Sequence, residues 1–145
     1  MTTAAQTIFI EDMAEGQTAT YTRIVDEQTI AAFAQASGDT NPVHLDQEFA
    51  SATMFKGRIA HGVLSTSFVS TVLGTQLPGQ GTILLKIDNV FRAPVHIDDE
   101  LTAEVVVSAI DRKKNRVTFT CRCRVGDKVV TEGSALVIAP SRSST

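Results

Sequence analysis

The chain has 145 residues, 43% of them hydrophobic and 20% charged, which is the size of a single domain able to bury its own core. Its 13 lysines and arginines against 16 aspartates and glutamates give a net charge of -3, which disfavours nucleic-acid and anionic-membrane partners. No window approaches the about 20 consecutive apolar residues of a membrane span, and the N-terminus lacks a signal-peptide pattern, so we expect a cytoplasmic protein.

The first part of the chain is predicted to contain one strand and one well-bounded helix. The strand is expected over residues 21–25, after a run of polar threonines. Asp26 is a favoured N-cap residue, and the helix that it begins is predicted to end at Gly38. Apolar side chains recur at helical spacing along its inner face, at Ile30, Phe33 and Ala34.

A second long helix is predicted over residues 61–77, with a loop some way before it. The loop, residues 37–46, should be stiff, because Asn41 precedes a proline and is therefore biased away from helical backbone. In the helix, the positions that are not apolar carry small residues, so neighbouring elements can approach it closely on every side. We therefore expect it to be buried in the concave side of a curved sheet.

The second half of the chain is predicted to form that sheet. Apolar and polar residues alternate, as in half-buried strands, along most of four runs: residues 83–95, 101–109, 117–125 and 128–138. The connections are too short for parallel crossovers, so neighbouring strands should be antiparallel. Cys121 and Cys123 share one face of the third run, where a disulfide between them would strain the backbone, so both are expected to be reduced core residues.

Residues 37–46 gather an acid, an amide, a proline and a histidine into a few positions. A stiff loop can fix two polar side chains toward a common point, so Asp39 and His44 are candidates for an acid/base pair. The alternative is structural, with Asp39 capping a short helix and His44 an ordinary surface or core histidine. Taken alone, this segment slightly favours the structural alternative.

A second segment, residues 58–63, leads into the second long helix. The first backbone N–H groups of a helix have no intrahelical partner, and the helix dipole makes this end positive. Gly62 would let a substrate carbonyl approach this bare backbone closely, although a small residue is also common at a tightly packed helix start. Together, the two segments suggest a carbonyl polarised beside an acid/base pair.

Three motifs in this order, SGDTNPVHLD, IAHGVL and VFRAPVHIDDELTAEVVV, closely resemble the MaoC-like dehydratases, in particular the (R)-specific enoyl-CoA hydratases. The resemblance runs from about Gly16 to Ile138. It implies a single α+β domain over residues 1–145 with the hot-dog fold, an antiparallel sheet wrapped around a long central helix. Residues 1–15 and 139–145 are expected to be peripheral or frayed. Proteins of this kind are commonly dimers, and an edge strand that needs pairing agrees with a homodimer.

The resemblance also implies roles for individual residues. Asp39 and His44 would be the catalytic pair, and Gly62 would supply an oxyanion N–H group. The residues expected to line or brace the substrate site are Asn41, Ser70 and His61, the last of which should also help to set the helix start. The implied reaction is the reversible syn addition of water to a trans-2-enoyl-CoA, which gives the (R)-3-hydroxyacyl-CoA.

No metal or cofactor is expected beyond the coenzyme A of the acyl-CoA substrate, and the sequence contains neither a GxGxxG motif nor a P-loop. Two alternatives stay open. A 3-hydroxyacyl-[acyl-carrier-protein] dehydratase would use the same chemistry on a different partner. A non-catalytic acyl-thioester binding module would need neither Asp39 nor His44. The sequence fixes neither the acyl chain length nor which member of the pair is the base.

Overall fold

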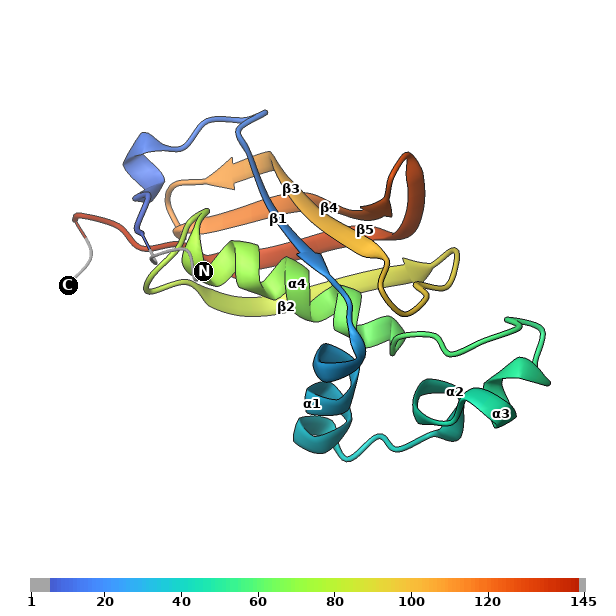
Figure 1. Ribbon diagram of the computed structural model, residues 1–145. Coiled ribbons are helices and arrows are strands. Elements are labelled where there is room, and N and C mark those ends of the chain that lie inside the picture. The colour runs from blue at the N-terminus through green and yellow to red at the C-terminus, as the bar shows by residue number, and fades with distance from the viewer. Residues whose placement is uncertain (1–5, 144–145) are drawn as a thin grey trace.

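One antiparallel sheet and one long helix organise the molecule. The computed structural model describes residues 6–143; the remaining parts of the two predicted frayed ends, residues 1–5 and 144–145, lie outside the described residues. The elements in chain order are η1 (Ile10–Asp12), β1 (Thr18–Ile24), α1 (Glu27–Ser37), α2 (Pro42–Leu45), α3 (Gln47–Ser51), α4 (Gly62–Thr75), β2 (Ile83–Phe91), β3 (Glu100–Asp111), β4 (Arg116–Val125) and β5 (Lys128–Ile138). The strand order is β1-β3-β4-β5-β2, and α4 lies along one face of the sheet (Figure 1). The predicted α+β architecture is confirmed.

Alternating side chains of β3 and β4 build the core against α4. The inward-facing residues, each at most 2% exposed, are Leu101, Ala103, Val105, Val107, Val117, Phe119, Cys121 and Cys123. The predicted alternation is therefore confirmed along most of both strands. It fails at Ala109, which is exposed, because a bulge between Val107 and Ala109 shifts the register of β3 against β4.

The two cysteines are free thiols on the buried face of β4, as predicted. Removal from water penalises the thiolate, and this desolvation raises the pKa of Cys121 and of Cys123 to about 12. Cys123 Sγ also donates a hydrogen bond of 3.5 Å to the carbonyl of Ser65 on α4. Both cysteines therefore act as small core residues.

The side of the molecule at β2 differs from the prediction. Within the described chain β2 pairs with β5 alone, and its large apolar side chains are exposed: Ile83, Leu84, Leu85, Val90 and Phe91. α4 is also buried on one face only, and small residues lie exposed on the other: Gly62, Ser70 and Gly74. The prediction of a half-buried strand over 83–95 is wrong for one copy of the chain, because β2 is the sheet edge and ends at Phe91. The prediction that the helix is buried against the sheet is confirmed for one of its faces.

The described parts of the two termini are better fixed than expected. Ile10 and Met13 are 1% and 2% exposed, and Ala139 is 3% exposed. Arg112, in the turn between β3 and β4, donates hydrogen bonds to the carbonyls of Ile10 at 2.6 Å and Met13 at 2.9 Å. The prediction of peripheral or frayed ends is wrong for these residues, because the core and one guanidinium group hold them.

α1, α2 and α3 gather beyond the N-terminal end of α4 (Figure 1). α1 has the predicted boundaries: Asp26 accepts a hydrogen bond from the Thr29 N–H at 2.9 Å, and Gly38 ends the helix in the left-handed region with φ 80°. This arrangement places the chain that follows Gly38 beside the start of α4.

Residues 37–46 contain more helix than predicted. Asn41 does avoid helical backbone, but its side chain caps α2, whose first residue is the proline. Asp46 ends α2 and caps α3, accepting a hydrogen bond from the Phe49 N–H at 3.1 Å. The expected loop is therefore a short linker followed by the capped turn of α2, and α3 begins directly after it.

Candidate active site

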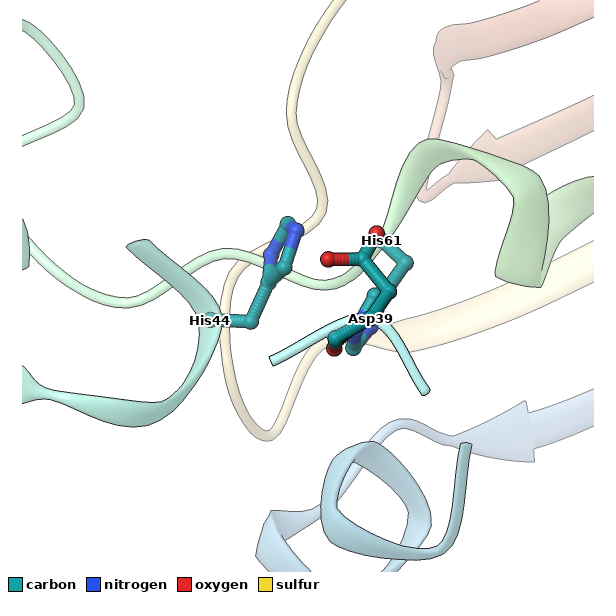
Figure 2. A group of neighbouring side chains, drawn as sticks. All are labelled: Asp39, His44 and His61. Carbon is teal, nitrogen blue, oxygen red and sulfur yellow. Dashed lines mark hydrogen bonds between the residues drawn. The ribbon is translucent and has the colours of Figure 1, made fainter. Parts of the chain in front are cut away.

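Three side chains from separate parts of the chain meet at the N-terminal end of α4 (Figure 2). Asp39 precedes α2, His44 lies within α2, and His61 directly precedes α4. A carboxylate oxygen of Asp39 and one ring nitrogen of each histidine all lie within 4.8 Å of one another. Asp39 is exposed, whereas His44 and His61 are 7% and 2% exposed. The structure thus places the two predicted catalytic residues beside the histidine of the helix start.

His44 is held in one tautomer by a backbone carbonyl. Its Nδ1 lies 2.8 Å from the carbonyl oxygen of Ile59, and because a carbonyl only accepts, Nδ1 carries the hydrogen and leaves Nε2 as an acceptor. Burial lowers the pKa of His44 below its ordinary value of 6.5; the Ile59 hydrogen bond opposes this shift, His61 adds to it and Asp39 opposes it. At pH 7 most of His44 is therefore neutral and can accept a proton.

Asp39 is positioned by the linker between α1 and α2. Its Oδ1 accepts a hydrogen bond from the Asn41 N–H at 3.2 Å, and its own N–H donates to Ser37 Oγ at 3.1 Å. The carboxylate oxygen and the His44 nitrogen lie at most 4.8 Å apart. One water can bridge such a gap, since each of its hydrogen bonds is about 2.8 Å long.

Arg58 braces the backbone that carries His44, a role that was not predicted. Its Nε donates to the carbonyl of His44 at 2.7 Å, and its guanidinium group pairs with Glu27 at the start of α1. These partners lie 14 and 31 residues away in the chain. No local spacing pattern could have pointed to contacts of such range.

Gly62 opens α4 at the mouth of a cavity. Leu64 N–H bonds the carbonyl of His61 at 2.9 Å, and within the described residues the N–H groups of Gly62 and Val63 have no backbone partner. A largely apolar cavity of about 320 Å³ extends from this point between α4 and the end of β2; among its lining residues are His61, Gly62, Ser65, Phe91 and Val95. A Cβ atom on Gly62 would lie 3.0 Å from Cδ1 of Phe91, so the ring leaves little room for a side chain here.

The remaining predicted contacts are divided between the site and the surface. Asn41 Oδ1 accepts a hydrogen bond from the Val43 N–H at 3.3 Å, so its side chain braces α2. His61 is the N-cap residue of α4, but its side chain makes no capping hydrogen bond. Ser70 is exposed on α4, about 12 Å beyond Gly62 along the helix axis, and does not join the Asp39, His44 and His61 cluster. Its contact with substrate stays a prediction.

The same cluster offers donor atoms for a metal ion, but the ring orientation opposes this use. Imidazole binds metals through a lone pair in the plane of the ring. The rings of His44 and His61 are stacked, with centroids 3.8 Å apart and planes 27° apart, so one ion beside the stack would not lie in the plane of both rings. The arrangement suits proton transfer better than metal binding.

Comparison with known proteins agrees with this geometry. Residues 9–133 match the family described as MaoC like domain. The chain belongs to the MaoC-like family. Like the sequence resemblance, this match includes Asp39, His44 and Gly62.

MaoC-like relatives cover most of the chain. An (R)-specific enoyl-CoA hydratase from Rhodospirillum rubrum is 47% identical over 134 residues, 92% of this chain and 93% of the relative. A mitochondrial 3-hydroxyacyl-[acyl-carrier-protein] dehydratase from Arabidopsis thaliana is 33% identical, over 83% of this chain and 74% of the relative. The solved structure of R-hydratase PhaJ1 from Pseudomonas aeruginosa superposes with a TM-score of 0.91 and 41% identity, covering 95% of this chain and 89% of that one. The predicted hot-dog fold is confirmed.

Among the described residues, no helix has the length and apolar character needed to cross a membrane.

Proposed function

We propose that this MaoC-like chain catalyses the reversible (R)-specific hydration of trans-2-enoyl-CoA. The observation that carries the proposal is the placement of Asp39 and His44 within 4.8 Å of each other, beside the free N–H groups at the start of α4. The names of the relatives from R. rubrum and P. aeruginosa support the same activity.

The start of α4 polarises the substrate. The β carbon of an enoyl thioester accepts water only if the thioester oxygen can take up negative charge. The Gly62 N–H points from a helix N-terminus, where the dipole also favours negative charge, and it donates to that oxygen in the transition state. The cavity beside Gly62 is largely apolar, as an acyl thioester requires.

Asp39 and His44 move the protons. They hold one water between them; its oxygen bonds to the β carbon while one of its protons passes to the pair. The electrons of the double bond move to the α carbon and the thioester oxygen, and the pair then returns a proton to the α carbon. Both additions come from the side that carries the pair, which gives syn addition, and the two residues act as one titrating unit.

The proposed reaction uses no metal and no cofactor apart from the coenzyme A of the substrate, because the thioester itself activates the double bond. A cytoplasmic location stays a prediction from the sequence.

We also propose that two copies pair through β2. An exposed apolar edge strand is a template for pairing with another chain, and here Gly62, an exposed small residue of α4, lies beside Phe91 of this strand. A two-fold axis would join the edges into one continuous sheet. Light scattering should give twice the chain mass of 15.5 kDa, and Leu85→Asp should shift it toward one chain. A wild-type mass of one chain would contradict the pairing.

Hydration of crotonyl-CoA tests the activity directly. The purified protein should remove the enoyl-thioester absorbance without added cofactor, and chiral analysis should identify the (R) product. Asp39→Asn serves as the inactive control. If the folded protein hydrates neither short nor medium enoyl-CoA, the hydratase assignment is wrong.

A carrier-protein dehydratase is the second candidate, supported by the relative from A. thaliana. The two candidates share the chemistry and differ in the group attached to the acyl chain. The same acyl chains should therefore be presented on coenzyme A and on acyl-carrier protein. A higher kcat/KM for the carrier-protein thioester favours this second candidate, and binding without turnover of either favours a non-catalytic module.

A further inference from the structure

His61 contacts both other members of the cluster. Its Nε2 lies 2.9 Å from the backbone carbonyl oxygen of Asp39, 22 residues earlier in the chain. Its ring stacks on the ring of His44, with centroids 3.8 Å apart and planes 27° apart. On another side it packs against Phe33 of α1, with centroids 4.9 Å apart. One buried ring therefore connects the start of α4 to both proposed proton-transfer residues.

The hydrogen bonds make the two stacked histidines complementary. A carbonyl accepts hydrogen bonds and donates none, so the contact with Asp39 places a hydrogen on Nε2 of His61. The corresponding contact with Ile59 places the hydrogen of His44 on Nδ1. His44 thus keeps Nε2 free for the reacting water, whereas His61 uses Nε2 to hold the backbone.

The other nitrogen of His61 has no role in proton exchange that the structure supports. Its Nδ1 is buried and has no hydrogen-bond partner among the described residues. A relay through the ring would need a proton donor or acceptor at that atom. The contacts of His61 are those of a support for its two neighbours.

We propose that His61 is a positioning residue, which anchors the backbone of Asp39 through Nε2 and covers the face of the His44 ring. It holds the pair at the separation that one water spans and takes no proton itself. The catalytic consequence rests on the proposed function, because it concerns the residues that handle the water. The predicted tautomers of the two rings can be tested whether or not the protein is a hydratase.

The charged groups near His44 also influence its pKa, so a substitution of His61 must leave them in place. Titratable and charged groups on the elements around the two rings include Glu27, Asp39, Asp46, Glu48, Arg58, Arg92 and His96. Arg58 is paired with Glu27, and its Nε is bonded to the carbonyl of His44. α4 contributes no charged residue. Substitutions at His61 leave all these groups in the chain and remove only the ring or its donor.

Two substitutions separate the two contacts. His61→Gln keeps an amide donor for the Asp39 carbonyl but loses the ring, so water reaches the face of His44. The pKa of His44 should then rise toward its ordinary value, and the acidic limb of kcat/KM against pH should move to higher pH. His61→Phe keeps a ring over His44 but loses the donor, so kcat should fall about 10-fold or more at every pH, with little change in KM.

The outcomes are decisive in both directions. A His61→Gln enzyme with an unshifted acidic limb, or a folded His61→Phe enzyme with wild-type kcat, overturns the corresponding part of the proposal. Circular dichroism and the melting temperature identify a variant that fails to fold. If His61→Phe does not fold, His61→Gln still tests the cover on His44.

Nuclear magnetic resonance of the wild-type protein supplies a test that needs no substrate. The chain has 3 histidines, and the signals lost in His96→Gln and in His61→Gln assign the ¹⁵N signals of all three rings. At neutral pH His61 should carry its hydrogen on Nε2 and His44 should carry its hydrogen on Nδ1. The same tautomer in both rings overturns the proposal, whereas a protein with the expected tautomers and no hydratase activity contradicts only the proposed function.

Discussion

The sheet and the segment from residue 38 to residue 61 are held by different forces. In the sheet, apolar side chains such as Phe119 and Val105 are completely buried, and packing fixes their positions. In the segment, side chains of His44, Arg58 and His61 bond to backbone carbonyls that belong to distant residues. Stability should therefore depend mainly on the sheet, and activity on the segment, so that substitutions in one region spare the property of the other.

The largest expected effect is the loss of activity without loss of structure. Asp39→Asn and His44→Gln should each lower kcat by about 10²- to 10⁴-fold, because each removes a proton-transfer group. The melting temperature of Asp39→Asn should stay close to that of the wild type, since this side chain is exposed. Steady-state assays with crotonyl-CoA measure kcat, and calorimetry measures the melting temperature.

Matched controls are available for both changes. Asp127→Asn, in the exposed turn between β4 and β5, is the control for Asp39→Asn. His96→Gln, at the histidine outside the cluster, is the control for His44→Gln. Both should keep nearly full activity. Undiminished turnover in Asp39→Asn or His44→Gln would remove that residue from the mechanism.

Substitutions in the core of the sheet should lower stability and leave substrate binding unchanged. Phe119→Ala should lower the free energy of unfolding by about 3–5 kcal/mol, because it leaves a cavity where the side chain is 0% exposed. Phe49→Ala, on α3 in the site segment, should cost much less because that side chain is 50% exposed. Urea unfolding measures the free energy of unfolding of both variants. Equal decreases would show that the segment contributes as much to stability as the sheet does. Folded Phe119→Ala should retain the wild-type KM.

Two glycines, one in the sheet and one in the site segment, test how tightly the backbone is packed in each region. A Cβ atom on Gly133 of β5 would lie 1.9 Å from the carbonyl oxygen of Asp88 on β2, so Gly133→Ala must push the strands apart. Overpacking of this kind costs about 1–3 kcal/mol or more. At Gly57, in the site segment, the nearest atom to an added Cβ is Gln47 Nε2 at 3.7 Å, an ordinary contact. Thermal unfolding of Gly57→Ala should therefore differ little from wild type, and a wild-type melting temperature for Gly133→Ala would contradict the close approach.

The smallest effect is the pH dependence of stability that His44 contributes. Its pKa is lowered in the folded protein, so above the unfolded value of 6.5 its contribution to stability is fully present. As the pH falls from 6.5 through the lowered folded pKa, the unfolded chain binds the proton first and this stability is lost. Urea unfolding from about pH 8 to about pH 5 should show a decline that is weaker in His44→Gln. An equal decline in the two proteins would assign it to other groups.

The sheet was predictable where local pattern determines environment. The alternation of apolar and polar residues along each strand correctly predicted that Val105 and Phe119 face the core. It failed at Ala109, because the bulge before this residue depends on the pairing of two strands and not on one residue type. The exposure of β2 was also missed, since its apolar side chains have the pattern of core residues although the strand lies at the edge of the sheet.

Of the candidate site, the sequence pointed to the two residues that we propose transfer protons. Asp39 and His44 stand in a short, recognisable motif, and the structure brings them together. His61 was expected to line or brace the site, but its bond to the Asp39 carbonyl and the contacts of Arg58 could not be found in this way. Arg58 and His61 act on carbonyl groups, which every residue carries, so no residue type in the sequence marks the other half of the contact.

The buried thiols of β4 have a practical consequence. With a pKa of about 12, only about one thiol in 10⁵ is ionised at pH 7, and Cys121 and Cys123 are the chain's 2 cysteines. Alkylating reagents should leave the native protein unmodified. A cysteine introduced at the exposed Ser70 would then be the single labelling site of the folded chain, and spin labels placed there would report the distance between α4 helices in a pair of copies.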